Sequence, residues 1–389
     1  MPYWRLSGFY FFYFAALGVL VPYWGLYLKS LGFSALQIGQ LMAIPMVTKF
    51  VAPFVWGWLG DHLGYRMAIV RLGALLTSII FVSVFWLQGF WELGLAMVLF
   101  SFFWNAVLPQ FEAVVLCYLG DDITRYAQIR LWGSVGFIAT VLVLGLLVDL
   151  QGPAAVLPVL FSIYGVIWFT SLLIADPTQK PHPVEQPGII SVLLKPSVMA
   201  FLVACFLLQA GHGVYYGFYS IYMEELGYSK TVIGQLWALG VIAEVIVFIF
   251  MHRLLKTMGA RNVLMLSLLL AALRWYLIGH FNDSLVILFF AQTLHAATFG
   301  TFHAAAIHLV HHYFTGRHQG RGQALYSSLS FGFGGALGTV LSGYLWEDAG
   351  ATVVFNISIA VSLLALIIVW RWVVNDLNLP RQTIPSGDM

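Results

Sequence analysis

Long apolar runs, broken by short charged or Gly/Pro-rich stretches, dominate the pattern of this chain. Each run supplies the roughly 20 residues that an α-helix needs to cross a bilayer. The pattern predicts an all-α membrane protein with twelve spanning helices, the first run being a span and not a cleaved signal peptide. The predicted spans are 5–29, 35–59, 67–87, 92–116, 127–149, 153–174, 197–223, 231–255, 262–280, 284–312, 321–346 and 350–373.

One longer polar break, 175–196, divides the spans into six and six. Its prolines favour an extended linker over a helix. They are Pro177, Pro181, Pro183, Pro187 and Pro196. We therefore expect an N-terminal bundle over 1–174, a linker over 175–196, a C-terminal bundle over 197–374 and a tail over 375–389.

An internal repeat relates the two groups of spans. Shifted by 195 positions (226 minus 31), residues 31–66 align with 226–261 without a gap, and eleven of the thirty-six pairs are identical. Both copies contain L-G-x-S-x-x-x-I-G-Q-L, which apolar composition alone does not explain. The pattern indicates parallel repeats related by an axis along the membrane normal, an architecture in which transporters bind substrate between the halves.

Composition excludes other classes of protein. Only 9% of the residues are charged, against about 25% in soluble domains. The net charge of +2 is spread over short loops and does not indicate a nucleic-acid partner. Cys117 and Cys205 lie in apolar stretches and offer neither a disulfide framework nor a metal box. We expect no cofactor and no bound metal.

The distribution of basic residues predicts the orientation. With the N-terminus in the cytoplasm, only Lys29 and Lys230 lie in outside loops. Fourteen other basic residues fall in cytoplasmic segments: Arg5, Arg66, Arg71, Arg125, Arg130, Lys180, Lys195, Arg253, Lys256, Arg261, Arg317, Arg321, Arg371 and Arg381. We expect a multi-pass protein of the bacterial cytoplasmic (inner) membrane, with both termini cytoplasmic.

Residues 57–66 read G-W-L-G-D-H-L-G-Y-R, which resembles the loop signature of the major facilitator superfamily. The signature residues are Gly57, Asp61, Gly64 and Arg66, with a degenerate second copy at Lys256, Gly259 and Arg261. The resemblance implies the major facilitator fold and a cytoplasmic gate at these two loops. A plain turn with a solvated charge is the alternative.

A second resemblance begins at residue 126. The run Y-A-Q-I-R-L-W-G-S-V-G-F, with Glu112 eighteen positions before Arg130, is similar to the lactose-permease-like group. The resemblance implies solute:proton symport, with Glu112 and Arg130 binding substrate and with Glu244, Arg274 and His295 coupling the proton. Thr298 stands where lactose permease has a further acidic residue, so the identity of the proton carrier does not transfer.

The run Arg130 to Ser134 and the cation Lys49 are most similar to the phenylpropionate permeases. That resemblance implies an aromatic carboxylate as the imported substrate. An oligosaccharide or a nucleoside remains the alternative.

Five charged residues of the predicted spans lie at or near membrane depth: Lys49, Glu112, Arg130, Glu244 and Arg274. A charge at the bilayer centre costs about 2.5–3.5 kcal/mol, so such residues face the bundle interior or a water-filled cavity. Lys49 and Glu244 are related by the repeat and would confront each other if both faced one cavity. A fixed salt bridge between the halves is the alternative. Three cations against two carboxylates favour an anionic substrate.

Helical spacing adds polar and aromatic positions. Asn105, Pro109 and Glu112 share one face, and further stripes join Gln209, His212, Tyr216 and Tyr219, and Gln292, His295, Phe299 and Phe302. We expect Asn105, His212 and Tyr216 to bind substrate, although aromatic residues make up 16% of the chain and stripes also arise by chance.

One histidine group suggests a different class of protein. His308, His311 and His312 resemble a histidine box of membrane di-iron enzymes, but such enzymes need several boxes. We therefore expect a transporter and not an enzyme, acting as a monomer in the lipid bilayer on a small-molecule substrate and protons. A non-transporting membrane protein or a metal-dependent membrane enzyme is the remaining alternative.

Overall fold

The computed structural model describes residues 1–120, 122, 125–177, 189–315 and 318–374, and these form helices without any strand. The first half contains α1 (Tyr3–Ser30), α2 (Ala35–Leu63), α3 (Arg66–Ser83), α4 (Phe90–Leu119), α5 (Tyr126–Gln151), η2 (Pro153–Ala155) and α6 (Val156–Leu172). The described part of the expected linker contains one short helix, α7 (Ile190–Leu193). The second half contains α8 (Pro196–Glu225), α9 (Lys230–Met258), α10 (Ala260–His280), α11 (Leu285–Thr293), η3 (Ala296–Thr301), α12 (Phe302–Tyr313), α13 (Gln319–Ser327), η5 (Ser328–Gly334), α14 (Gly335–Ala349) and α15 (Ala351–Trp372).

These helices confirm the predicted spans. Twelve helical stretches among the described residues are long and apolar enough to cross a membrane, and each coincides with one predicted run. The tenth and eleventh spans differ from ideal helices, because each contains a π-helical segment, η3 or η5. Residues 178–188 of the expected linker and the whole expected tail, 375–389, lie outside the described residues.

The sequence repeat is also a repeat of local structure. Ser34 and Ser229 occupy equivalent positions, and each accepts a hydrogen bond from a backbone N–H of the helix that it caps. Gly32 and Gly227 both adopt a φ of +85°, a backbone conformation that is unfavourable for residues with a Cβ atom. The shared motif therefore encodes one turn and one helix start in each half.

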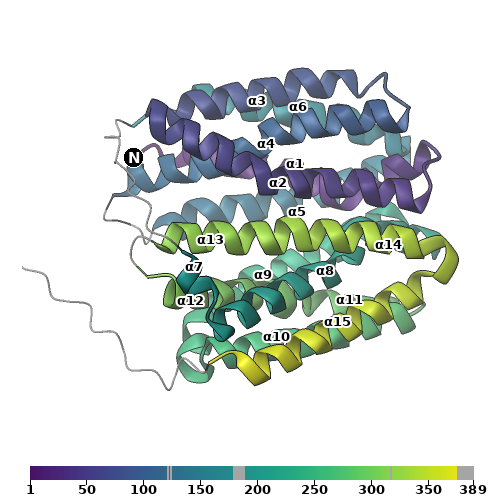
Figure 1. The fold of residues 1–389 in the computed structure, drawn as a ribbon. Helices are drawn as coiled ribbons and strands as arrows, with labels where there is room; N and C mark the ends of the chain where they lie inside the picture. The colour runs from purple at the N-terminus through teal and green to yellow at the C-terminus, as the bar shows by residue number, and fades with distance from the viewer. Residues whose placement is uncertain (121, 123–124, 178–188, 316–317, 375–389) are drawn as a thin grey trace, which may run out of the picture.

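Figure 1 shows the two halves side by side, with α1–α6 in purple to blue and α8–α15 in teal to yellow. Helix α2 packs on α14 of the other half, α9 packs on α5, and α1 meets α8. Close approach depends on glycine: a Cβ added to Gly39 would lie 2.9 Å from the carbonyl oxygen of Thr339, and one added to Gly145 would lie 2.5 Å from that of Lys230.

Polar contacts between the halves gather at the end of the bundle that carries the turns 31–34 and 226–229, here called the turn end. Lys29 pairs with Glu224 at 3.2 Å and with Glu225 at 3.1 Å. Asp149, at the end of α5, accepts hydrogen bonds from the backbone N–H groups of Lys230 and Thr231, each at 2.8 Å.

Glu347, near the end of α14, accepts from the N–H of Ala35 at 2.7 Å. Asp149 and Glu347 each cap the first residues of a helix in the opposite half, where a carboxylate is favoured by unpaired N–H groups and the helix dipole. We call these two residues the carboxylate caps.

Candidate functional site

Three charged side chains of the first half come together on its inner face. Lys49 on α2, Glu112 on α4 and Arg130 on α5 lie within electrostatic range of one another. Glu112 accepts a hydrogen bond from Tyr126 at 3.3 Å, and no ion pair within 4.0 Å joins it to Arg130 among the described residues. The Arg130 guanidinium instead stacks 3.8 Å from the ring centre of Phe14. Its hydrogen-bonding edge is therefore available to a ligand.

Space for Arg130 depends on a glycine one turn along α5. A Cβ at Gly133 would lie 2.8 Å both from Nη1 of Arg130 and from the ring of Phe14. The absence of a side chain at Gly133 thus permits the stacked arginine. Sequence reasoning named Arg130 but not Tyr126, Phe14 or Gly133, although Tyr126 and Gly133 stand in the run that carries the resemblance.

Asn105 is buried and joins two helices. Its amide donates to the carbonyl of Pro45 and to the hydroxyl of Thr48, both at 2.9 Å. Thr48 also donates to Ser101 of α4 at 2.9 Å. These bonds fix α4 to α2 directly before Lys49. In this state Asn105 positions the helix that carries Lys49, and its own amide nitrogen is already engaged.

The charged groups of the second half form a connected row. Nη1 of Arg274, on α10, lies 3.1 Å from Nδ1 of His295, and Nε2 of His295 lies 3.8 Å from the Glu244 carboxylate on α9. Because arginine can only donate, Nδ1 must accept, and the imidazole hydrogen is placed on Nε2. His295 therefore directs an N–H towards Glu244, an arrangement suited to proton exchange between them.

Arg274 is fully buried and has no carboxylate within 4.0 Å among the described residues. Its guanidinium donates to Thr298 at 3.2 Å and to Gln292 at 3.0 Å, and it lies 4.1 Å from the ring centre of Tyr215. Thr298, at the position where the sequence departs from lactose permease, is thus a neutral acceptor for Arg274. Arg274 thus orients His295 through its hydrogen bond to Nδ1.

Lys49 and Glu244, which the repeat relates, form no ion pair within 4.0 Å among the described residues. Lys49 lies within electrostatic range of Glu112 and Arg130, and Glu244 lies within range of Arg130. The packing gives a reason. Helix α2 faces α14 and α9 faces α5, so repeat-related residues meet the partner half at different helices. Arg130 is the charge that links the two groups.

A column of parallel rings connects the His295 group to Lys49. His295 stacks on Phe299 (ring centres 5.3 Å, planes 6° apart), and Phe299 stacks on His303 (6.3 Å, 9°). Phe302, which the predicted stripe included, is instead buried in the core of the second half. The π-helical turn η3 widens the helix, so that His303 and not Phe302 continues the stripe. Sequence periodicity alone could not show this.

His212 and Tyr216, which we expected to bind substrate, lie on the seventh span and differ in burial. His212 is fully buried, its Nδ1 bonds the Leu208 carbonyl at 2.9 Å, and its ring packs edge-on against Trp275. Tyr216 is half-buried beside it. Of these two residues, Tyr216 is the more accessible.

The residues of the expected gate loops lie at the end of the bundle where α1 begins and α15 ends. Gly64 ends α2 with a φ of +70°, and Gly259 precedes α10 with a φ of +76°. Arg66 donates to Gln110 at 2.9 Å, and Arg261 donates to the Trp370 carbonyl at 2.5 Å. Gly57 lies within α2 and Lys256 is exposed on α9, whereas the side chain of Asp61 lies outside the described part.

Two other features stand apart from the charged groups. Among the described residues, no three His, Cys, Asp or Glu side chains lie close enough to hold a metal ion, the group around His308, His311 and His312 included.

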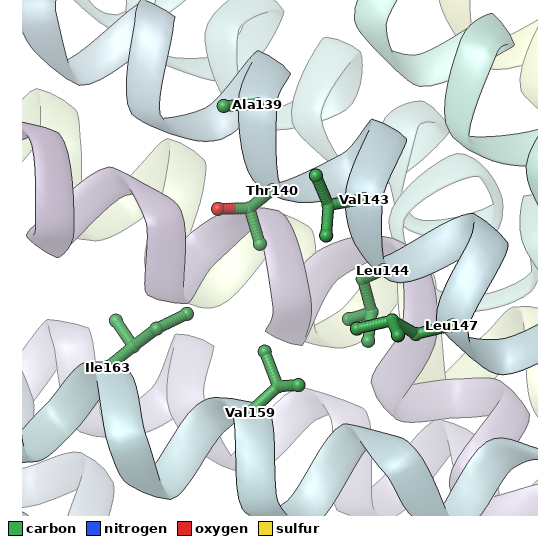
Figure 2. A pocket seen from close by; sticks show the side chains of 7 residues that line it. All are labelled: Ala139, Thr140, Val143, Leu144, Leu147, Val159 and Ile163. Carbon is green, nitrogen blue, oxygen red and sulfur yellow. The ribbon is translucent and has the colours of Figure 1, made fainter. Parts of the chain in front are cut away.

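A crevice of about 190 Å³ between α5 and α6 is lined almost entirely by carbon (Figure 2). Thr140 supplies the one oxygen among the side chains drawn there, so this crevice offers no site for a charged solute.

The sequence and the fold both match known transporters. Residues 3–357 match the model of the "MFS_1 like family". A protein of Escherichia coli (strain K12) described as "Probable 3-phenylpropionic acid transporter" is 32% identical over 88% of this chain and 90% of its own length. The maltose permease of Geobacillus stearothermophilus is 27% identical over 92% of each chain.

The solved structures extend the comparison to the fold. A crystal structure of a mutant of the nucleoside transporter NupG superposes with a TM-score of 0.85 at 17% identity, covering 95% of this chain and 98% of its own. At that identity the likeness concerns the fold alone. The relatives and the structural neighbour are transporters and not enzymes, as the sequence predicts.

Proposed function

Since this chain belongs to the MFS_1 like family and is a secondary transporter of the major facilitator type, we propose that it imports an aromatic carboxylate, such as 3-phenylpropionate, together with protons. Five charged residues support the proposal: the cations Lys49, Arg130 and Arg274 outnumber the carboxylates Glu112 and Glu244 by one. A bound carboxylate balances that charge, and the free edge of Arg130 can grip it with two parallel hydrogen bonds.

Aromatic side chains near the cations can contact the aromatic part of the substrate. Phe14 lies under Arg130, and Phe331 lies under Lys49 with the ammonium 5.4 Å from its ring centre. Together with Phe299 and Tyr216 these rings can enclose an apolar body while the cations hold its charged end. Glu112, fixed by Tyr126, limits how far Arg130 and Lys49 can move when the site is empty.

Proton coupling is assigned to Glu244, His295 and Arg274. Arg274 fixes the tautomer of His295, and His295 faces the Glu244 carboxylate across 3.8 Å. Protonating Glu244 removes a negative charge that attracts Arg130. Arg130 then becomes a better partner for the substrate carboxylate. Proton and substrate therefore favour the same state of the transporter.

We assign the turn end to the outside and the chain termini to the cytoplasm, in an inner membrane, on the distribution of basic residues. The bundles 1–174 and 197–374 act as the rocking units of a monomer, joined by the linker 175–196. Gly57, Asp61, Gly64 and Arg66, with Lys256, Gly259 and Arg261, form the cytoplasmic gate.

An oligosaccharide substrate is the second candidate, because the maltose permease relative covers nearly the whole chain. A neutral sugar would leave the extra cation uncompensated. Counterflow in proteoliposomes separates these substrates without a pH gradient: vesicles preloaded with 3-phenylpropionate, maltose or a nucleoside are assayed for uptake of the same labelled solute. We expect exchange of the aromatic acid, abolished in Arg130→Ala at normal protein abundance. Maltose exchange that persists in Arg130→Ala would contradict the proposal.

A further inference from the structure

His303 is a polar residue of the central region to which neither the resemblance nor the relatives assign a role. It lies on α12, two helical turns beyond His295, and is half-buried. Phe299 stacks on one face of its ring, and Phe331 meets it edge-on, with ring centres 5.7 Å apart and planes at 69°. The same Phe331 lies under the ammonium of Lys49, so His303 and Lys49 flank one aromatic ring from opposite halves of the molecule.

The hydrogen bond of His303 fixes which nitrogen carries its hydrogen. Nδ1 lies 3.1 Å from the hydroxyl of Tyr326, a residue with no exposed surface. A buried hydroxyl hydrogen needs an acceptor, and Nδ1 is the acceptor within reach. Tyr326 therefore donates, and the neutral imidazole carries its hydrogen on Nε2. Nε2 has no hydrogen-bond partner among the described residues.

Two positively charged groups of the first half, Lys49 of α2 and Arg130 of α5, lie within electrostatic range of His303. Two cations from one half and an N–H from the other half thus converge on one region. An anion is the ligand that all three donors can share.

We propose that His303 is a binding residue that donates from Nε2 to the carboxylate of the transported solute, opposite Lys49 and Arg130. This rests on the proposed function, because it requires an anionic substrate. A carboxylate held this way contacts both halves at once: its oxygens accept from Lys49 and Arg130 on one side and from His303 on the other. Tyr326 acts as a positioning residue that keeps the imidazole in the donating tautomer.

Equilibrium binding to the purified full-length protein tests this inference. The probes are 3-phenylpropionate and its neutral amide, 3-phenylpropionamide, which share the aromatic body and differ in charge. In His303→Ala we expect the affinity for the acid to fall about tenfold or more, as for loss of one hydrogen bond to a charged group. The affinity for the amide should change much less. His303→Gln, which restores an N–H donor, should recover most of the acid affinity.

Two further variants complete the design. Tyr326→Phe should weaken acid binding less than His303→Ala does, again without a matching loss for the amide. His311→Gln is the matched control, because it alters an exposed histidine two turns further along the same helix, and it should bind both ligands as the wild type does.

The outcomes separate this inference from the proposed function. Equal losses for acid and amide in His303→Ala would mark a packing role and overturn the inference alone, as would unchanged acid affinity. Failure of the wild type to bind any aromatic acid would overturn the substrate class and, with it, the role assigned to His303.

Discussion

At the scale of single residues, Arg130 of the first half contacts the Phe14 ring and forms no ion pair within 4.0 Å among the described residues. A guanidinium that lies over the Phe14 ring contacts it through its face, which leaves the N–H donors at its edge available to a planar carboxylate. Arg274 of the second half is the opposite case, since its donors are taken up by Thr298, Gln292 and His295. One arginine is therefore suited to binding a ligand and the other to orienting a histidine.

The space beside Arg130 provides a test. In Gly133→Ala the new methyl group would overlap Nη1 of Arg130, and the end of this flexible side chain has to move. We expect normal membrane abundance and a transport rate lower by about tenfold or more, because a shift of about 1 Å at a binding group is costly. Gly165→Ala on α6 is the control, since nothing lies within 4 Å of its added Cβ. Equal activity of the two variants would contradict the role of Arg130.

The carboxylate of α9 provides a second test. Glu244→Gln keeps the shape of the side chain but cannot exchange a proton with His295. We expect loss of uphill accumulation with counterflow exchange retained, because exchange needs no net proton movement. Glu92→Gln, an exposed position on α4, should leave both assays unchanged. Equal losses in accumulation and exchange would argue against proton coupling through Glu244.

The charged residues could be predicted from the sequence because a charge within an apolar run is expensive and therefore conspicuous. Their partners could not be predicted in the same way. Whether Phe302 or His303 continues a stripe depends on a local widening of the helix, which hydrophobic periodicity does not reveal. Likewise, spacing placed Asn105 on the face of Glu112, but only the packing of α4 on α2 showed that its amide bonds Pro45 and Thr48.

At the scale of helices, the two halves are joined at the turn end by carboxylates of one half. These carboxylates accept hydrogen bonds from N–H groups at the start of helices in the other half. Asp149 serves both as the end of α5 and as a cap for α9, and its carboxylate also accepts from the Thr231 hydroxyl at 2.6 Å. Glu347 does the same between α14 and α2. Each cap exists only while the two halves touch at this end, so the caps favour this state over one that is open there.

The caps predict a shift of conformation. In Asp149→Ala the N–H groups of Lys230 and Thr231 lose their acceptor, and we expect a larger population open at the turn end. Spin labels at Leu31 and Leu226, repeat-related positions in the two halves, should report longer distances by electron–electron double resonance. Cys117 and Cys205 are replaced first, since both are free thiols.

Asp283→Ala is the control for this measurement, because Asp283 is an exposed carboxylate at the same end. A distance distribution in Asp149→Ala identical to that of Asp283→Ala would show that the cap does not hold this end closed.

At the scale of the whole molecule, the two halves share one six-helix architecture but carry different ionisable residues. The shared motif gives each half the same turn and helix start, which is why the fold could be predicted from the sequence. In the proposed function, the first half uses Lys49 and Arg130 to bind an anion, and the second uses Glu244 and His295 to carry a proton. The π-helical segments η3 and η5 occur only in the second half among the described residues.

The central claim is that charges between the halves bind an aromatic anion and couple it to a proton. Concentrative uptake of labelled 3-phenylpropionate into proteoliposomes with an alkaline interior tests it, with protein-free liposomes measuring passive entry of the acid. We predict an initial rate of uptake above the protein-free rate, an excess that falls strongly when nigericin collapses the pH gradient and is absent in Arg130→Ala. Uptake no faster than in protein-free liposomes, or equally fast in the wild type and Arg130→Ala, would contradict the claim.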